Sequence, residues 1–191
     1  MAVLIGVLLA ATSCRSAGPK APACEAGALS KVLQQKCSIG NLVFDFSSPA
    51  AFSGVSAERL KFVPADGGGS AGFTISGDGP EILSSARGRQ GITFFLYPLI
   101  STTDASPSIG AVETKVQGYR GTSTAYSYFH IGGSGGEADA YVSLKGAEHK
   151  ETPKKVGRRL SSAKSTVTVG ITVPEDGVTS IEAVTFVVKT R

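Results

Sequence analysis

Hydrophobic and polar residues alternate along most of the chain beyond residue 40. In residues 41–46, for example, Leu42, Phe44 and Phe46 share one face, and the same period of two recurs in residues 58–64. This alternation is typical of a β-strand with one buried face. The expected strands are residues 41–46, 58–64, 70–76, 91–99, 108–117, 124–131, 138–145, 166–174 and 180–189.

Short glycine-rich segments separate these strands. Residues 67–69 and 77–80 are expected to form turns, and residues 132–137 a flexible loop. Residues 175–177 are expected to form the turn of a closing hairpin. Strands and helices do not alternate as a parallel sheet requires. We therefore expect an all-β fold, an antiparallel β-sandwich of about nine strands with jelly-roll or immunoglobulin-like topology.

One segment has helical instead of alternating periodicity. In residues 25–36, one apolar face is formed by Ala28, Leu29, Val32 and Leu33. We expect one short N-terminal helix here, with Cys24 and Cys37 at its two ends.

The first residues have the pattern of an export signal. Residues 2–11 are apolar throughout, which is the length of a signal-peptide core and shorter than the roughly 20 residues of a membrane-spanning helix. Small residues then precede Cys14, as in a bacterial lipobox. We expect residues 1–13 to be a signal peptide, residues 14–23 a tether and residues 24–191 one β-sandwich domain. Cys14 is the expected lipidation site; plain cleavage with release, or a buried N-terminal element of a cytosolic protein, are the alternatives.

Cys24 and Cys37 are the cysteines that remain after such processing. Two thiols in an oxidising compartment normally pair. A zinc site needs four ligands, and only His130 and His149 could add to these cysteines. A redox pair would have a CxxC spacing. We expect a disulfide, with free thiols as the alternative.

The amino-acid composition favours many short strands, and the net charge does not require a nucleic-acid partner. Hydrophobic residues make up 41% of the chain and charged residues 18%, against about 25% in an average soluble protein. The chain has 24 glycines. A net charge of +4 allows attraction to anionic surfaces without requiring nucleic acid, and we expect no nucleic-acid partner.

Residues 145–164 depart from the strand pattern because they are polar and basic. We expect a solvated loop. An alternative is an electrostatic contact with anionic lipid headgroups, acidic polysaccharide or nucleic acid, although the segment lacks the interleaved aromatic residues of single-strand binders. The clustered basic residues are Lys154, Lys155, Arg158 and Arg159.

Catalytic patterns are absent from the sequence. There is no Gly-x-Ser-x-Gly elbow, and no spacing supplies His130 with a nucleophile. Glu113 is expected to be a solvent-facing strand residue. We predict no enzymatic activity, no cofactor and no metal site. Calcium binding beside the glycine-rich loops stays open, and its candidate ligands are Asp66, Asp78, Glu137 and Asp139.

The run from Cys24 to Phe44 resembles the opening of secreted bacterial β-sandwich proteins of the PEP-CTERM-sorted type. Its most specific part is Cys37-Ser-Ile39-Gly40-x-x-x-Phe44, with Lys36 in place of the usual glycine. Residues 167–173 and 180–186 also resemble the closing hairpin of those proteins. The resemblance implies an exported β-sandwich of the envelope or extracellular matrix. No Pro-Glu-Pro motif is present, so lipidation of Cys14 is the expected alternative means of surface attachment.

From these patterns we predict an exported protein of the bacterial cell surface, outer membrane or extracellular space, with a structural or adhesive role. Its expected partners are envelope or matrix polymers, and it contacts membrane only through a lipid anchor. The alternative is a carbohydrate-binding module that uses surface tyrosines. The chain has no Trp, but Tyr126 and Tyr128 share a face because they are two residues apart. These tyrosines could instead pack against neighbouring strands.

Overall fold

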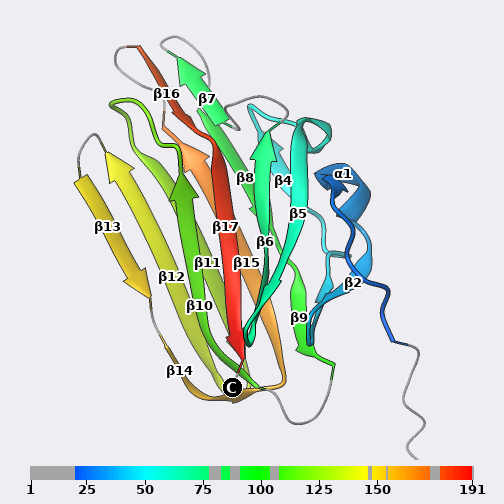
Figure 1. Cartoon of the computed structure of the whole chain (residues 1–191). Coiled ribbons are helices and arrows are strands. Elements are labelled where there is room, and N and C mark those ends of the chain that lie inside the picture. Colours follow the sequence, from blue (N-terminus) through cyan, green and yellow to red (C-terminus); the bar gives the residue numbers. More distant parts are fainter. Residues whose placement is uncertain are drawn as a thin grey trace, which may run out of the picture.

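Antiparallel strands build almost the whole fold, as the alternating pattern predicts. The structure is a computed structural model and describes residues 20–77, 83–86, 91–103, 108–145, 148–153, 155–172 and 177–190. Within them two sheets pack face to face, with β5, β6, β17 and β10 in front of β15, β11 and β12 in Figure 1. The expected class, an antiparallel β-sandwich with a small helix, is confirmed.

The front sheet in Figure 1 has six strands in the described part of the chain. Their order is β1 (Gly27–Ala28), β5 (Leu60–Gly67), β6 (Ser70–Gly77), β17 (Ala183–Thr190), β10 (Ile109–Gln117) and β14 (Lys155–Leu160). The predicted turn at residues 67–69 is confirmed, because Gly67 pairs with Ser70. Gly68 and Gly69 between them have φ values of 55° and 85°, which suit a two-residue hairpin loop.

The second sheet has nine strands among the described residues. Its main path is β13 (Glu148–Pro153), β12 (Gly136–Lys145), β11 (Ala125–Gly133), β15 (Ser162–Ile171), β9 (Leu99–Thr102), β3 (Leu42–Asp45) and β2 (Lys36–Ile39). Two further strands, β8 (Ile92–Leu96) and β4 (Ala51–Ser53), extend it beside β15. A separate pair, β7 (Leu83–Ala86) and β16 (Val178–Ile181), lies at one end of the sandwich, at the top of Figure 1.

Some expected strands are divided and further short strands occur between them, so the strands are more numerous than expected. The expected strand at residues 91–99 ends at Pro98, where the sequence predicts an edge or a bend. There β8 and β9 follow one another along β15. The Ser165 N–H donates a hydrogen bond to the Pro98 carbonyl oxygen at 3.0 Å across this break. Pro98 therefore bends the strand while the sheet stays joined.

Phenylalanine side chains fill the space between the sheets. Phe73 of β6 is fully buried, and its ring centroid lies 5.3 Å from those of Phe62 and Phe186 in its own sheet. It lies 5.8 Å from the ring of Phe44 on β3 of the other sheet, in an edge-to-face arrangement. Phe186 contacts Phe129 of β11 in the same way at 5.7 Å. Edge-to-face contacts of this kind add to the free energy of burial and join the two layers.

The helix is shorter than the sequence predicts. Within residues 25–36 only Leu29–Val32 (α1) form a helix, although the apolar face extends over the whole segment; a separate 3-10 helix, η1 (Ala57–Arg59), precedes β5. Gly27 and Ala28 pair with β5 instead, and after the helix Gln34 has a φ of 69°. The predicted helix is therefore shortened because residues before it belong to β1 and Lys36 after it belongs to β2.

The expected disulfide joins Cys24 and Cys37, which are 13 positions apart. On one side of it Cys24 donates its N–H to the Ser38 carbonyl oxygen at 2.9 Å, and the Ser38 N–H donates to Pro22 at 2.7 Å. The chain then crosses to β5 through β1. The N-terminal segment therefore links the edges of both sheets, and the disulfide holds it against β2.

The expectation of a solvated loop at residues 145–164 is wrong. The segment contains β13 and β14 and the start of β15. β13 pairs with β12, whereas β14 pairs with β10 in the opposite sheet. Polar residues are tolerated in these strands because both lie at the ends of their sheets, where one edge has no partner strand among the described residues.

Two expected connections are also wrong. The predicted closing hairpin does not form, because β15 belongs to the nine-stranded sheet and β17 to the six-stranded sheet. Residues 132–137 are not a flexible loop: strand pairing continues to Gly133 and Gly136, which leaves a two-residue turn. Residues 78–80, 175 and 176 lie outside the described part of the chain, so the turns expected there are not described.

The position of Phe73 predicts a large loss of stability on truncation. We expect Phe73→Ala to lower the free energy of unfolding by about 3–5 kcal/mol, because it removes ring contacts and leaves a cavity. Val63→Ala on the adjacent β5 is the control, since Val63 is 43% exposed; its effect should stay within about 0.5 kcal/mol. Urea unfolding measures both, and equal effects would contradict this account of the core.

The disulfide should stabilise the N-terminal segment measurably. Replacing both Cys24 and Cys37 with Ala should lower the free energy of unfolding by about 3 kcal/mol, because the unfolded chain regains the freedom of a short closed loop. Thermal and urea unfolding of the oxidised protein and the double variant measure the difference. Unchanged stability would show that the bridge does not restrict the unfolded chain.

Candidate functional site

The outward face of the nine-stranded sheet carries the candidate site. Along β11, Ser127, Phe129 and Ile131 are fully buried between the sheets. Because side chains alternate along a strand, Tyr126, Tyr128 and His130 point to the opposite side, and all three are partly exposed. The period of two that predicted this strand therefore also places these three rings in one row.

The neighbouring strand β12 adds polar and aromatic side chains to this row. Tyr141 lies opposite Tyr128, and Asp139 lies opposite His130. Both alternate with buried alanines on β12, so they share the outward face. We call this surface the tyrosine face; it consists of Tyr126, Tyr128, His130, Asp139 and Tyr141.

Asp139 organises the polar part of the tyrosine face. Its Oδ1 atom accepts a hydrogen bond from the Tyr128 hydroxyl at 2.6 Å and lies 2.7 Å from His130 Nδ1. Since an ionised carboxylate only accepts hydrogen bonds, the imidazole donates from Nδ1. The Tyr128 and His130 rings lie nearly parallel, at 12° and with centroids 6.3 Å apart. One carboxylate thus fixes two rings.

Tyr126 is positioned by a glycine on the other neighbouring strand. Gly170 of β15 lies opposite Tyr126. A Cβ atom at Gly170 would come within 2.6 Å of the Tyr126 Cζ and Oη atoms, so the tyrosine ring occupies the space that a side chain would fill. The ring rests on the backbone of β15, and its remaining exposed surface faces solvent.

The outward aromatic residues belong to one sheet among the described residues. In the six-stranded sheet Phe62, Phe73 and Phe186 are all fully buried in the core. The outward positions of β10 and β17 hold small, aliphatic, polar or charged residues instead. The two faces of the sandwich therefore have different chemistry.

Burial and Asp139 change the acidity of Tyr128. The pKa of Tyr128 rises from its ordinary value of 10.0 to about 12, first because burial disfavours the charged phenolate. The hydrogen bond to Asp139 and the negative charges of Asp139 and Glu137 act in the same direction. At neutral pH Tyr128 is therefore a neutral hydrogen-bond donor.

The basic residues predicted to contact ligand, where the structure describes them, belong to another strand. Lys155, Arg158 and Arg159 belong to β14 in the six-stranded sheet. Lys154 and Cys14 lie outside the described residues. The tyrosines and the basic residues expected to contact ligand thus come from strands of different sheets.

Sequence reasoning missed the partner of His130. It treated residues 132–137 as a loop, and so it did not place His130 opposite Asp139. The signal was present in the chain: with Ser134 and Gly135 as a two-residue turn, residues equally distant from the turn must pair. Recognising this turn would have paired His130 with Asp139 and Tyr128 with Tyr141.

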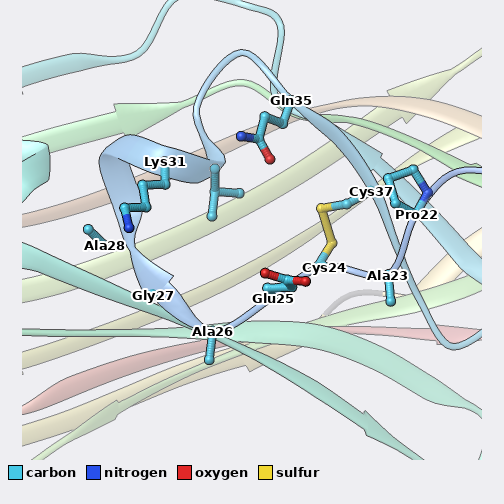
Figure 2. A pocket seen from close by; sticks show the side chains of 11 residues that line it. Pro22, Ala23, Cys24, Glu25, Ala26, Gly27, Ala28, Lys31, Gln35 and Cys37 are labelled. Atoms are coloured by element: carbon cyan, nitrogen blue, oxygen red, sulfur yellow. A yellow bond between two sulfur atoms is a disulfide. The ribbon is translucent and has the colours of Figure 1, made fainter.

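A hollow of about 390 Å³ lies beside the disulfide. Its walls come from residues 22–28 and from the segment around α1, and Figure 2 shows the Cys24–Cys37 bridge on one side. Glu25, Lys31 and Gln35 supply its polar side chains. These lining residues offer no nucleophile paired with a base, so the hollow supports no catalytic assignment.

The described part of the chain has neither a metal-binding cluster nor a membrane-spanning helix. Among the described residues, no three His, Cys, Asp or Glu side chains gather closely enough to hold a metal ion. The helices described here are also too short to cross a membrane.

Comparisons with protein-family models, curated proteins and solved structures find no match to this chain. The resemblance to PEP-CTERM-sorted proteins therefore stays a prediction. The fold and the tyrosine face define an antiparallel β-sandwich with one aromatic surface.

The contact between Tyr128 and Asp139 predicts a late alkaline titration. One tyrosine should titrate near pH 12 by ultraviolet absorbance, and Tyr128→Phe should remove this step. Asp139→Asn should lower the pKa of Tyr128, because the negative charge is lost, while burial still keeps it above 10.0.

The raised pKa of Tyr128 also determines how the stability of the protein changes with pH. The pKa of Tyr128 is higher in the folded protein than in the unfolded chain. Its contribution to the free energy of unfolding is therefore fully present below pH 10.0 and is lost as pH rises toward 12. Unfolding measured across this range should show a decline that Tyr128→Phe makes shallower. A variant with an unchanged decline would contradict the assignment.

Proposed function

We propose that this protein is an exported, non-enzymatic β-sandwich that binds polysaccharide of the cell envelope or extracellular matrix through the tyrosine face. Adhesion is then the consequence of polymer binding. This proposal joins the structural or adhesive role with the carbohydrate-binding alternative, because one surface can serve both.

The observation that carries the proposal is the one-sided distribution of aromatic residues. Partly exposed Tyr126, Tyr128 and Tyr141 lie on adjacent strands of one sheet. Flat aromatic rings offer apolar surface to the C–H side of a sugar ring at low entropic cost, since a tyrosine has few rotatable bonds. Polar groups beside such rings provide hydrogen bonds that fix orientation, and Asp139 and His130 supply them here.

Preorganisation of the rings also supports a binding role. Tyr126 rests on Gly170, and Tyr128 is held by its hydrogen bond to Asp139. Side chains that are already ordered lose less conformational entropy when a ligand binds. A surface built only for solubility would not need rings fixed in this way.

Export is supported by the N-terminal sequence and by the disulfide. Structural disulfides persist in oxidising compartments and are rare in the cytosol. The bridge between Cys24 and Cys37 begins at the first residue after the expected tether. A lipid on Cys14 would hold the sandwich at the membrane surface and leave the tyrosine face available to polymers.

Affinity gel electrophoresis of the purified protein tests the binding function. We expect slower migration in gels that contain a soluble polysaccharide, over a panel of neutral and charged polymers. Tyr126→Ala and Tyr141→Ala should each weaken binding about two- to tenfold, since an aromatic stacking contact contributes about 0.5–1.5 kcal/mol. Gly170→Ala should also weaken it by displacing the Tyr126 ring.

Val63→Ala, on the outward face of the six-stranded sheet, is the matched control and should migrate like the native protein. Thermal unfolding of every variant separates loss of binding from loss of fold. Unretarded migration of the native protein in all gels would overturn the proposal. Equal losses in the Val63 and tyrosine variants would show that binding does not use the tyrosine face.

A further inference from the structure

The tyrosine face continues beyond His130 to a position without a side chain. Gly132 follows His130 on the outward side of β11. Glu137 of β12 lies opposite Gly132 on one side, and Lys164 of β15 lies opposite it on the other. Both charged residues are exposed. The backbone at Gly132 is therefore flanked by a carboxylate and an ammonium group.

His130 forms a third side of this position. A Cβ atom at Gly132 would lie 3.1 Å from His130 Nε2, so the far nitrogen of the imidazole lies over the glycine. Asp139 accepts from Nδ1, and in the tautomer that carries its proton on Nδ1 the Nε2 atom is a hydrogen-bond acceptor. Asp139 is thus a positioning residue that directs Nε2 toward the space above Gly132.

Resting on the proposed function, we infer that Gly132 is the floor of a hydroxyl-binding subsite that selects neutral over acidic polysaccharides. His130 Nε2 and Glu137 accept hydrogen bonds, and Lys164 donates them. A sugar hydroxyl both donates and accepts, so neighbouring hydroxyls on one ring can use all three groups. The absence of a side chain at Gly132 lets the sugar approach the backbone.

The charges at this end of the tyrosine face determine the selectivity. Glu137 and Asp139 are carboxylates, and Lys164 is a single cation. The sum of these charges is negative. A polymer that carries carboxylates or sulfates meets like charge here, and like charges close together disfavour binding. A neutral polymer makes the same hydrogen bonds without this repulsion.

Polymers with one backbone and different charge test this inference. Hydroxyethylcellulose with carboxymethylcellulose, and dextran with dextran sulfate, provide such pairs for affinity gel electrophoresis. We expect the native protein to be retarded more by the neutral member of the pair that it binds. Glu137→Gln should raise the retardation by the charged member relative to the neutral one, because it removes negative charge beside Gly132.

Gly132→Ala tests the subsite directly. The added methyl group meets His130 Nε2 and covers the backbone, so binding of the neutral polymer should weaken about three- to tenfold, as expected for lost hydrogen bonds. Alanine is compatible with a strand, and an unchanged thermal midpoint confirms that the fold is intact. Lys115→Ala on the six-stranded sheet is the control and should bind like the native protein.

The outcomes separate the subsite from the proposed function. If Tyr126→Ala loses binding and Gly132→Ala does not, the tyrosine face binds polymer but the subsite is overturned. If the charged polymers retard the native protein as much as the neutral ones or more, the proposed selectivity for neutral polysaccharides is overturned. If no polymer retards the native protein, the proposed function fails and this inference fails with it.

Discussion

The packing of phenylalanine rings between the two sheets is the interaction on which the rest of the structure depends. Phe73 and Phe186 of the six-stranded sheet contact Phe44 and Phe129 of the other sheet edge-to-face. All four are fully buried. Because strand side chains alternate, fixing these rings inside also fixes which residues face solvent. A shift of β11 by one residue would bring Tyr128 inward and expose Phe129, so the core sets the orientation of the tyrosine face.

The polar contacts at the surface depend on the same register. Thr114 and Ser127 hydrogen-bond to each other in the buried space between β10 and β11. Satisfied polar groups in a core specify one arrangement, since any slip leaves them without partners. On the outer side of β11 the matching positions bring Tyr128 and His130 to Asp139. The same strand register therefore produces both the buried Thr114–Ser127 hydrogen bond and the contacts of Asp139 at the surface.

The alternation of residues was enough to predict the fold class and most strands, because burial of one sheet face imposes a period of two. It also placed Tyr126 and Tyr128 together, and cysteine usage predicted the disulfide. It failed at residues 145–164, because the edge strands β13 and β14 are polar and carry no alternation signal. It failed again at the expected closing hairpin, since nothing local shows that β15 and β17 belong to different sheets. The residues of the motif from Cys37 to Phe44 have structural positions. Cys37 belongs to the disulfide, Gly40 lies in the turn between β2 and β3, and the Phe44 ring is buried in the core.

Chemical-shift mapping by NMR tests the central claim most directly, because it reports on every backbone amide without choosing residues in advance. The isotope-labelled protein is titrated with soluble oligosaccharides cut from the polymer that retards it most. The account predicts perturbations concentrated on β11, β12 and β15 around Tyr126, Tyr141 and Gly132, with none on the outward positions of β5, β6 and β17. Perturbations centred on the six-stranded sheet, or on β14 with its basic residues, would contradict it.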